Sequence, residues 1–129
     1  VTTTDYYFIQ WIDQIYNAWE KNNSFITSDH EVSQYIKGYK ILSNTPWDKV
    51  DFVCIPDNVS LKFHWIMVVF YINNRCLYLT KKLVEQVLKN TSHIIPLFLM
   101  STEFDKKRND IDWKNSEEYV DYALTDPLA

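Results

Sequence analysis

The sequence predicts an α+β domain, and three features lead to that prediction. Apolar residues recur at helical spacing between residues 5 and 21, and again between residues 80 and 96. Between these segments, residues 51–79 hold short apolar runs separated by turn residues, which is typical of β-strands. Hydrophobic residues make up 47% of the 129-residue chain, enough for a sizeable core. We therefore expect one small domain with central strands flanked by helices.

Two helices are predicted before the strands. The first runs from Asp5 to about Lys21, and its apolar face consists of Phe8, Trp11, Ile12, Ile15, Tyr16 and Trp19. The second ends at Gly38 and begins with a capping-box pattern formed by Ser28 and Glu31. Residues 39–46 then form an extended connector, after which Trp47 is expected to plug the core.

Two or three strands are predicted next. The first is expected over residues 51–55 and to stop at Pro56, which has no backbone N–H to donate to a sheet. The second, residues 62–72, is apolar on both alternations, so both of its faces are expected to be buried. A two-residue turn at 73–74 leads into a third strand, residues 75–79, because asparagine tolerates the positive φ that such turns need.

The C-terminal third is predicted to be helical. Thr80 can cap a helix that runs to Pro96, and Pro96 can begin a new helix over residues 97–104. A short helix is expected over residues 117–124. Trp113, Tyr119, Val120 and Leu124 are the expected anchors of this last segment.

Several functional classes find no support in the residues. A net charge of −4 gives no general attraction for nucleic acid or for an anionic membrane, and no nucleic-acid motif occurs. The longest apolar run, residues 63–72, is far shorter than the roughly 20 residues that cross a bilayer. His30, His64 and His93 show no metal-ligand spacing, and no phosphate-binding glycine loop or serine-hydrolase motif is present. We expect no metal, cofactor, nucleic-acid or membrane partner.

Cysteine and glycine usage adds two expectations. Cys54 and Cys76 fall on separate predicted strands, so two reduced, buried thiols are expected. The chain holds one glycine and begins with Val1, which together suggest a fragment of a longer protein.

His64 has two interpretations from the residues alone. It is either a core histidine with a satisfied hydrogen bond or the general base of a nucleophilic site. Catalysis needs a thiol or hydroxyl within hydrogen-bond reach and a group that orients the other ring nitrogen. Cys54 is the thiol on the neighbouring predicted strand, although the strand pattern around it is more typical of an inert, buried cysteine.

A longer series of residues favours the catalytic interpretation. The series runs in order along the chain as Trp47, Val50-Asp51, Ile55-Pro56, Asn58 and His64-Trp65. It resembles the catalytic-domain core of the ubiquitin-like-specific (SUMO-type) cysteine proteases, especially their divergent plant branch found in transposon-derived genes. The resemblance extends back to residues 35–39 and forward through residues 95–99 to 107–113, and so covers about residues 30–127.

The resemblance implies a papain-like α+β fold of the adenain/SUMO-protease type, with this chain as its N-terminal part. In that family a His, Asp and Cys triad, helped by a glutamine, cleaves after the C-terminal glycine of a ubiquitin-like modifier. His64 matches the family histidine and is expected to be the general base. Trp65 is expected to line the channel for the modifier's C-terminal peptide. The implied partner is SUMO or another ubiquitin-like modifier with its conjugates, and the implied location is the nucleus or cytoplasm.

The sequence also departs from the family pattern. The family aspartate ends the strand after the histidine strand, but here no Asp or Glu occurs between Asp57 and Glu85. The nucleophile is expected in an Asp-Cys-Gly segment that these residues do not contain. We therefore expect a truncated, inactive copy, since losing a nucleophile costs on the order of 10⁶ in rate. The alternatives are a non-catalytic module that binds a ubiquitin-like modifier, or a remnant with no independent function.

Overall fold

The computed structural model describes residues 2–19, 23–40, 44–59, 64–79, 85–108, 110 and 121–123. Its helices are α1 (Tyr6–Trp19), α2 (Glu31–Lys37), α3 (Glu85–Ser101) and α4 (Phe104–Lys107), with 3-10 turns η1 (Asn23–Phe25) and η2 (Trp47–Lys49). Its strands are β1 (Thr2–Thr3), β2 (Phe52–Val59), β3 (His64–Tyr71), β4 (Cys76–Leu79) and β5 (Asp121–Ala123). The α+β class is confirmed. None of the described helices has the length and apolar character needed to cross a membrane.

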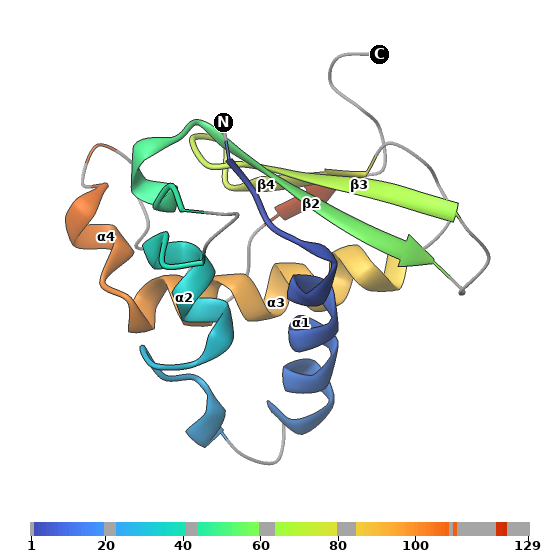
Figure 1. Cartoon of the computed structure of the whole chain (residues 1–129), viewed down its shortest axis with the longest axis horizontal. Helices are drawn as coiled ribbons and strands as arrows, with labels where there is room; N and C mark the ends of the chain where they lie inside the picture. The colour runs from blue at the N-terminus through green and yellow to red at the C-terminus, as the bar shows by residue number, and fades with distance from the viewer. Residues whose placement is uncertain are drawn as a thin grey trace.

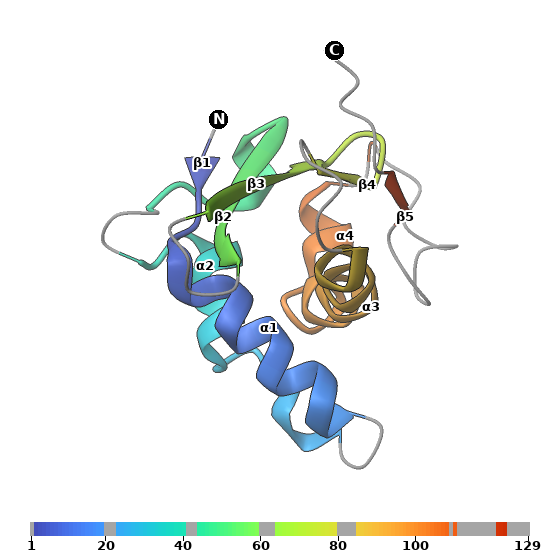
Figure 2. The ribbon, with the colours of Figure 1, turned by 90° about the vertical axis from the view of Figure 1, so that its right-hand side faces the viewer.

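The strands form one mixed sheet in the order β1-β2-β3-β4-β5. The β2–β3 and β3–β4 pairs are antiparallel, whereas β1 and β5 join the two edges in parallel. The second of the predicted strands, β3, is therefore central in the sheet. Figures 1 and 2 show α1, α2 and α3 together on one face of this sheet. The described part of the molecule thus has two layers, so the helices do not flank the strands on both sides.

The two faces of β3 differ, which contradicts the prediction that both are buried. Ile66, Val68 and Phe70 are buried on the face that the helices cover. On the other face Met67 is 37% exposed and Val69 is partly exposed. The apolar alternation predicted the strand correctly. It did not predict the burial correctly, because no described helix covers the second face.

The first predicted strand does not stop at Pro56, because β2 continues to Val59. The carbonyl of Cys54 accepts a hydrogen bond from the Thr4 N–H at 2.8 Å, so the polar backbone groups of Cys54 face β1. Pro56, two residues further along, faces the same edge beyond the end of β1. A missing N–H removes no ladder bond at that edge, and proline is tolerated there.

The predicted turn between β3 and β4 has the right place but the wrong length. Tyr71 pairs with Cys76, so four residues make the turn and not two. The positive φ falls on Arg75, at 50°, where the prediction had relied on the asparagines. The Arg75 N–H donates to the Ile72 carbonyl at 3.1 Å and closes this longer turn.

Two helix predictions in the C-terminal third are wrong. Helix α3 continues through Pro96 to Ser101, so no new helix begins there. Ile95 and Phe98 are buried on either side of the proline, and their packing keeps the helix continuous. Residues 121–123 form β5 where a helix had been predicted. Thr80, the expected cap, and the anchors Trp113, Tyr119, Val120 and Leu124 lie outside the described residues.

The core is centred on aromatic rings from α1, η2 and β3. Trp47 is 1% exposed, which confirms the prediction that it plugs the core. Its ring centroid lies 5.7 Å from that of Phe8 and 5.9 Å from that of Phe70. Tyr35 meets Phe8 edge-to-face at 5.2 Å, which brings α2 into the same cluster.

Gly38 ends α2, as predicted. Its left-handed backbone and the close approach of Pro46 both require a glycine at this position. It has φ 77° and ψ 28°, and a Cβ at this position would lie 2.5 Å from the backbone nitrogen of Pro46. We expect Gly38→Ala to lower the free energy of unfolding by about 2–4 kcal/mol, because left-handed backbone and overpacking both cost free energy. Urea denaturation followed by circular dichroism measures this loss.

The comparison variants for Gly38 separate its two constraints. Asparagine tolerates the left-handed conformation, but its Cβ still meets Pro46. Gly38→Asn should therefore lower the free energy of unfolding by more than half as much as Gly38→Ala does. Tyr39→Ala, at the exposed next residue, should change stability by no more than about 0.5 kcal/mol. A Gly38→Ala protein as stable as the parent would contradict the geometry of this helix end.

Candidate functional site

His64 is the first residue of the central strand β3. It pairs with Val59 of β2, and the next pair along the ladder joins Trp65 to Asn58. The His-Trp pair thus opens the strand that lies in the middle of the sheet. The side chains of His64 and Trp65 lie outside the described residues, so their predicted roles as general base and substrate contact stay predictions.

The strand that follows runs back toward His64. Val68 pairs with Leu79 at the end of β4, and His64 lies four residues before Val68 on β3. An aspartate that approaches His64 from this side would therefore occur soon after Leu79. The sequence there is Thr80-Lys81-Lys82, which contains no carboxylate and lies outside the described residues.

Neither cysteine is placed to serve His64. Cys54 pairs with Val69, five residues along β3 from His64 and therefore about 17 Å away at the usual rise of a strand. Cys76 pairs with Tyr71, which is farther still. Neither thiol is in a disulfide, as predicted, but both are partly exposed and not buried. Burial raises the pKa of Cys54, which favours the unreactive thiol.

Asp57 is a carboxylate that directly follows Pro56, where the first predicted strand was expected to stop. It is 8% exposed and pairs with Ile66, two residues from His64 on the next strand. Diagonal positions of this kind on neighbouring strands lie about 7–8 Å apart, within reach of longer side chains. The alternation Val53, Ile55, Asp57 on the buried face was the signal that could have identified it.

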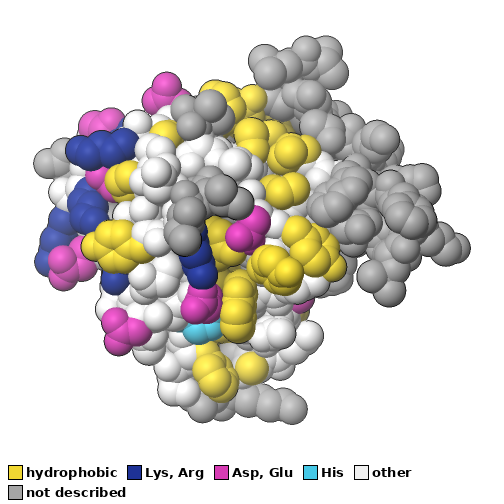
Figure 3. Space-filling view, viewed as in Figure 1, with side chains coloured by type: hydrophobic (Ala, Val, Ile, Leu, Met, Phe, Trp, Pro, Cys, Tyr) yellow, Lys and Arg dark blue, Asp and Glu magenta, His cyan; other side chains and the backbone are white. Residues whose placement is uncertain are grey.

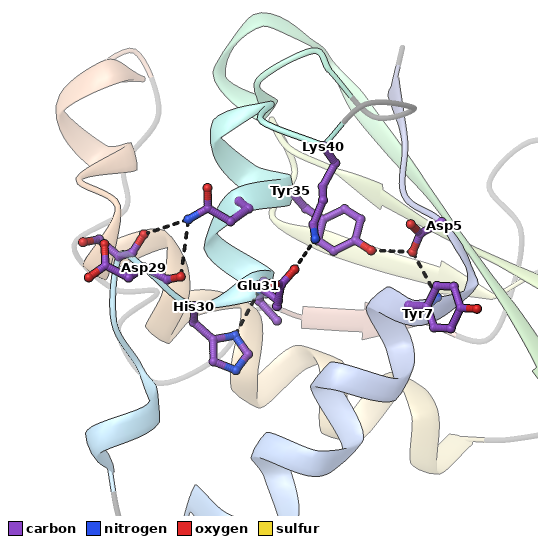
Figure 4. Close-up of polar contacts among 10 residues, drawn as sticks. Asp5, Tyr7, Asp29, His30, Glu31, Tyr35 and Lys40 are labelled. Carbon is purple, nitrogen blue, oxygen red and sulfur yellow. Dashed lines mark hydrogen bonds and ion pairs between the residues drawn. The ribbon is translucent and has the colours of Figure 1, made fainter.

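A polar cluster joins the start of α1 to α2 (Figure 4). The Tyr35 hydroxyl donates to Asp5 Oδ1 at 2.5 Å, and the same oxygen accepts from the Tyr7 N–H at 3.0 Å. Lys40 forms an ion pair with Glu31, and its Nζ lies 5.1 Å from the centroid of the Tyr35 ring. Burial and the Asp5 carboxylate raise the pKa of Tyr35. Tyr35 is therefore protonated at neutral pH and serves as a structural hydrogen-bond donor.

His30 caps α2, where the sequence predicts a capping box from Ser28 and Glu31. Its Nδ1 accepts a hydrogen bond from the Val32 N–H at 3.0 Å. Ser28 instead offers its carbonyl to Lys37 Nζ at 2.6 Å. The box therefore does not form, because the cap position lies two residues later than predicted. Burial lowers the pKa of His30, which agrees with an Nδ1 that must be unprotonated to accept.

Potential metal ligands and surface charges are further features that can mark a functional site. Within the described ranges, no group of three His, Cys, Asp or Glu side chains is placed to hold a metal ion. On the face shown in Figure 3, basic and acidic side chains lie close together on the side of α4, and hydrophobic ones gather over the sheet. The charges on this face are mixed in sign.

No protein-family model matches the chain, and no curated protein matches it. The evidence for a function therefore comes from the residues themselves and from their positions in the sheet.

Proposed function

We propose that this chain carries the histidine-bearing part of a SUMO-type cysteine protease catalytic domain with a papain-like fold. The observation that carries the proposal is the position of His64-Trp65 at the start of the central strand. The preceding β2 holds Ile55-Pro56, and the buried Trp47 lies just before it, in the order that the family resemblance requires. An intracellular location, in the nucleus or cytoplasm, follows from the same proposal.

In this proposal His64 is the general base. It takes the proton of a cysteine thiol, and the thiolate attacks the carbonyl of the modifier's C-terminal glycine. The resulting imidazolium then protonates the leaving amine. These residues contain no Asp-Cys-Gly segment, so the 129-residue polypeptide alone should not hydrolyse a modifier. Asp57 is the described carboxylate whose sheet position suits the third role, orienting the imidazole.

A modifier-binding module is the second candidate function. On the sheet face that carries the exposed Met67, the half-buried rings of Phe52 and Tyr71 stack at 5.6 Å, and Tyr71 meets Tyr78 at 5.2 Å. Aromatic and methionine side chains are enriched in protein interfaces. Such a surface favours a role in which the chain binds a modifier without cleaving it.

Binding of a modifier tests both candidates on the chain itself. We expect fluorescently labelled SUMO or ubiquitin to bind with a micromolar dissociation constant, and Trp65→Ala to weaken binding about 30-fold, as loss of an aromatic hot spot does. Trp19→Ala on α1 is the matched control and should leave the affinity unchanged. Absence of binding up to high micromolar concentrations of both modifiers would leave only the remnant interpretation.

A further inference from the structure

A pocket of about 230 Å³ lies between α1, η1 and the start of α2. Its lining residues are Trp11, Gln14, Ile15, Ala18, Phe25 and His30. No described residue of the sheet is among them, and none of these six residues belongs to the proposed protease site. None of the described lining side chains carries a carboxylate, an ammonium or a guanidinium group, so this part of the lining favours a neutral ligand.

The aromatic walls of the pocket hold one another in place. The His30 ring meets Trp11 edge-to-face, with centroids 5.6 Å apart and an angle of 85° between the planes. The same ring packs against Phe98 of α3 at 5.1 Å. Phe25 is 46% exposed, so one apolar ring is open to solvent. Ala18 provides space on the α1 side, because a larger residue at this position would fill the pocket.

His30 gives the pocket a hydrogen-bond donor. Because Nδ1 accepts from the Val32 N–H, the proton of the neutral ring is on Nε2. No described residue accepts a hydrogen bond from Nε2. Figure 4 shows the second ring nitrogen on the side of the ring away from the α2 backbone. A ligand with an acceptor atom can therefore satisfy a donor that no described residue accepts from.

From these features we propose that the pocket binds one neutral aromatic ring bearing a hydrogen-bond acceptor oxygen, which accepts from His30 Nε2. An apolar cavity of about 150 Å³ already holds benzene, so 230 Å³ admits a ring with a small substituent. The pocket is below the range of about 300–1,000 Å³ that suits drug-sized ligands. The ring could belong to a free small molecule or to a tyrosine side chain of a peptide.

Anisole and ethylbenzene form a matched pair of probes, because they have nearly the same shape and only anisole has an acceptor oxygen. We expect anisole to shift the amide signals of the lining residues in ¹H–¹⁵N NMR spectra at pH 7.5, saturating with a dissociation constant of about 1 mM. Ethylbenzene should bind about 3–10-fold more weakly, since it cannot make the hydrogen bond. Equal affinity for the two probes would overturn the role of His30.

Pocket-filling variants test the location. Ala18→Leu should abolish saturable binding, whereas Asn17→Leu, at an exposed neighbouring position, should leave it unchanged. If Ala18→Leu does not fold, Ala18→Val fills less space and should still weaken binding at least about 5-fold. Absence of saturable shifts in the parent chain, or unchanged binding in a folded pocket-filled variant, would overturn the proposal.

The source of the ring is decided by a third ligand. N-acetyl-tyrosinamide carries the phenol of a tyrosine between two neutral amides. Affinity within about tenfold of that of anisole would assign a peptide side chain, because the opening then admits a ring attached to backbone. Binding of anisole without N-acetyl-tyrosinamide would assign a free small molecule.

Discussion

Replacing Trp47 with alanine should lower the free energy of unfolding by about 3–5 kcal/mol, the usual cost of removing a large buried aromatic ring. Trp47 contacts the rings of Phe8 and Phe70, so its loss opens a cavity where α1 and β3 meet. A domain of this size is stable by about 5–15 kcal/mol, and the loss is therefore a large part of the total. Urea titration monitored by far-UV circular dichroism measures it without depending on tryptophan fluorescence.

Two further variants make the Trp47 result specific. Trp19→Ala removes the same atoms from a partly exposed site at the end of α1, where the ring stacks on His93, so it should cost less than half as much. Trp47→Phe keeps an aromatic ring in the core, so it should lower the free energy of unfolding by less than half as much as Trp47→Ala does. If Trp47→Ala and Trp19→Ala were equally destabilising, Trp47 would not be the centre of the core.

The sequence predicted the elements whose signal is repeated along many residues. The prediction of the apolar face of α1 was correct because Phe8, Ile12 and Ile15 recur at spacings that only a helix can bury together. The prediction of strand β3 was correct because its apolar run is too short for a buried helix and is bounded by turn residues. In both segments several residues independently indicate which side is buried, so one misleading residue does not change the prediction.

Both proline predictions failed, for a shared reason. Pro56 and Pro96 lack an N–H, but what that absence costs depends on neighbours distant in the sequence. At Pro56 the N–H would face a sheet edge that β1 no longer covers, and at Pro96 the buried residues around it hold α3 together. The prediction could not include either condition, because both are set by tertiary packing.

The candidate site was predicted in part. The position of His64 on the central strand followed from the local sequence, whereas the nearness of Asp57 depends on the register of β2 against β3. A strand that ended at Pro56 would have left Asp57 in a turn, so the error about Pro56 also hid this carboxylate. His30 was missed as a cap for a related reason, since capping depends on which residue the chain places just before α2.

His64 should be essential in any longer polypeptide that supplies the cysteine. Reading the transcript beyond the codon for Ala129 is expected to reveal a segment with a glutamine and an Asp-Cys-Gly motif. In the protein encoded by that transcript, His64→Gln should lower kcat/KM for a fluorogenic SUMO substrate by about 10⁶-fold. Removing the general base abolishes nearly all of the rate acceleration that a catalytic triad provides.

Asp57 and Cys54 supply the matched comparisons for that enzyme. Asp57→Asn should cost about 10⁴-fold if this carboxylate orients the imidazole, the usual effect of removing the third member of a triad. Cys54→Ser should leave the rate within about twofold, because Cys54 lies about 17 Å along the sheet from His64. A His64→Gln enzyme with parental activity would refute the protease proposal. A full rate in Asp57→Asn would instead leave His64 as the base and place its orienting group on another segment.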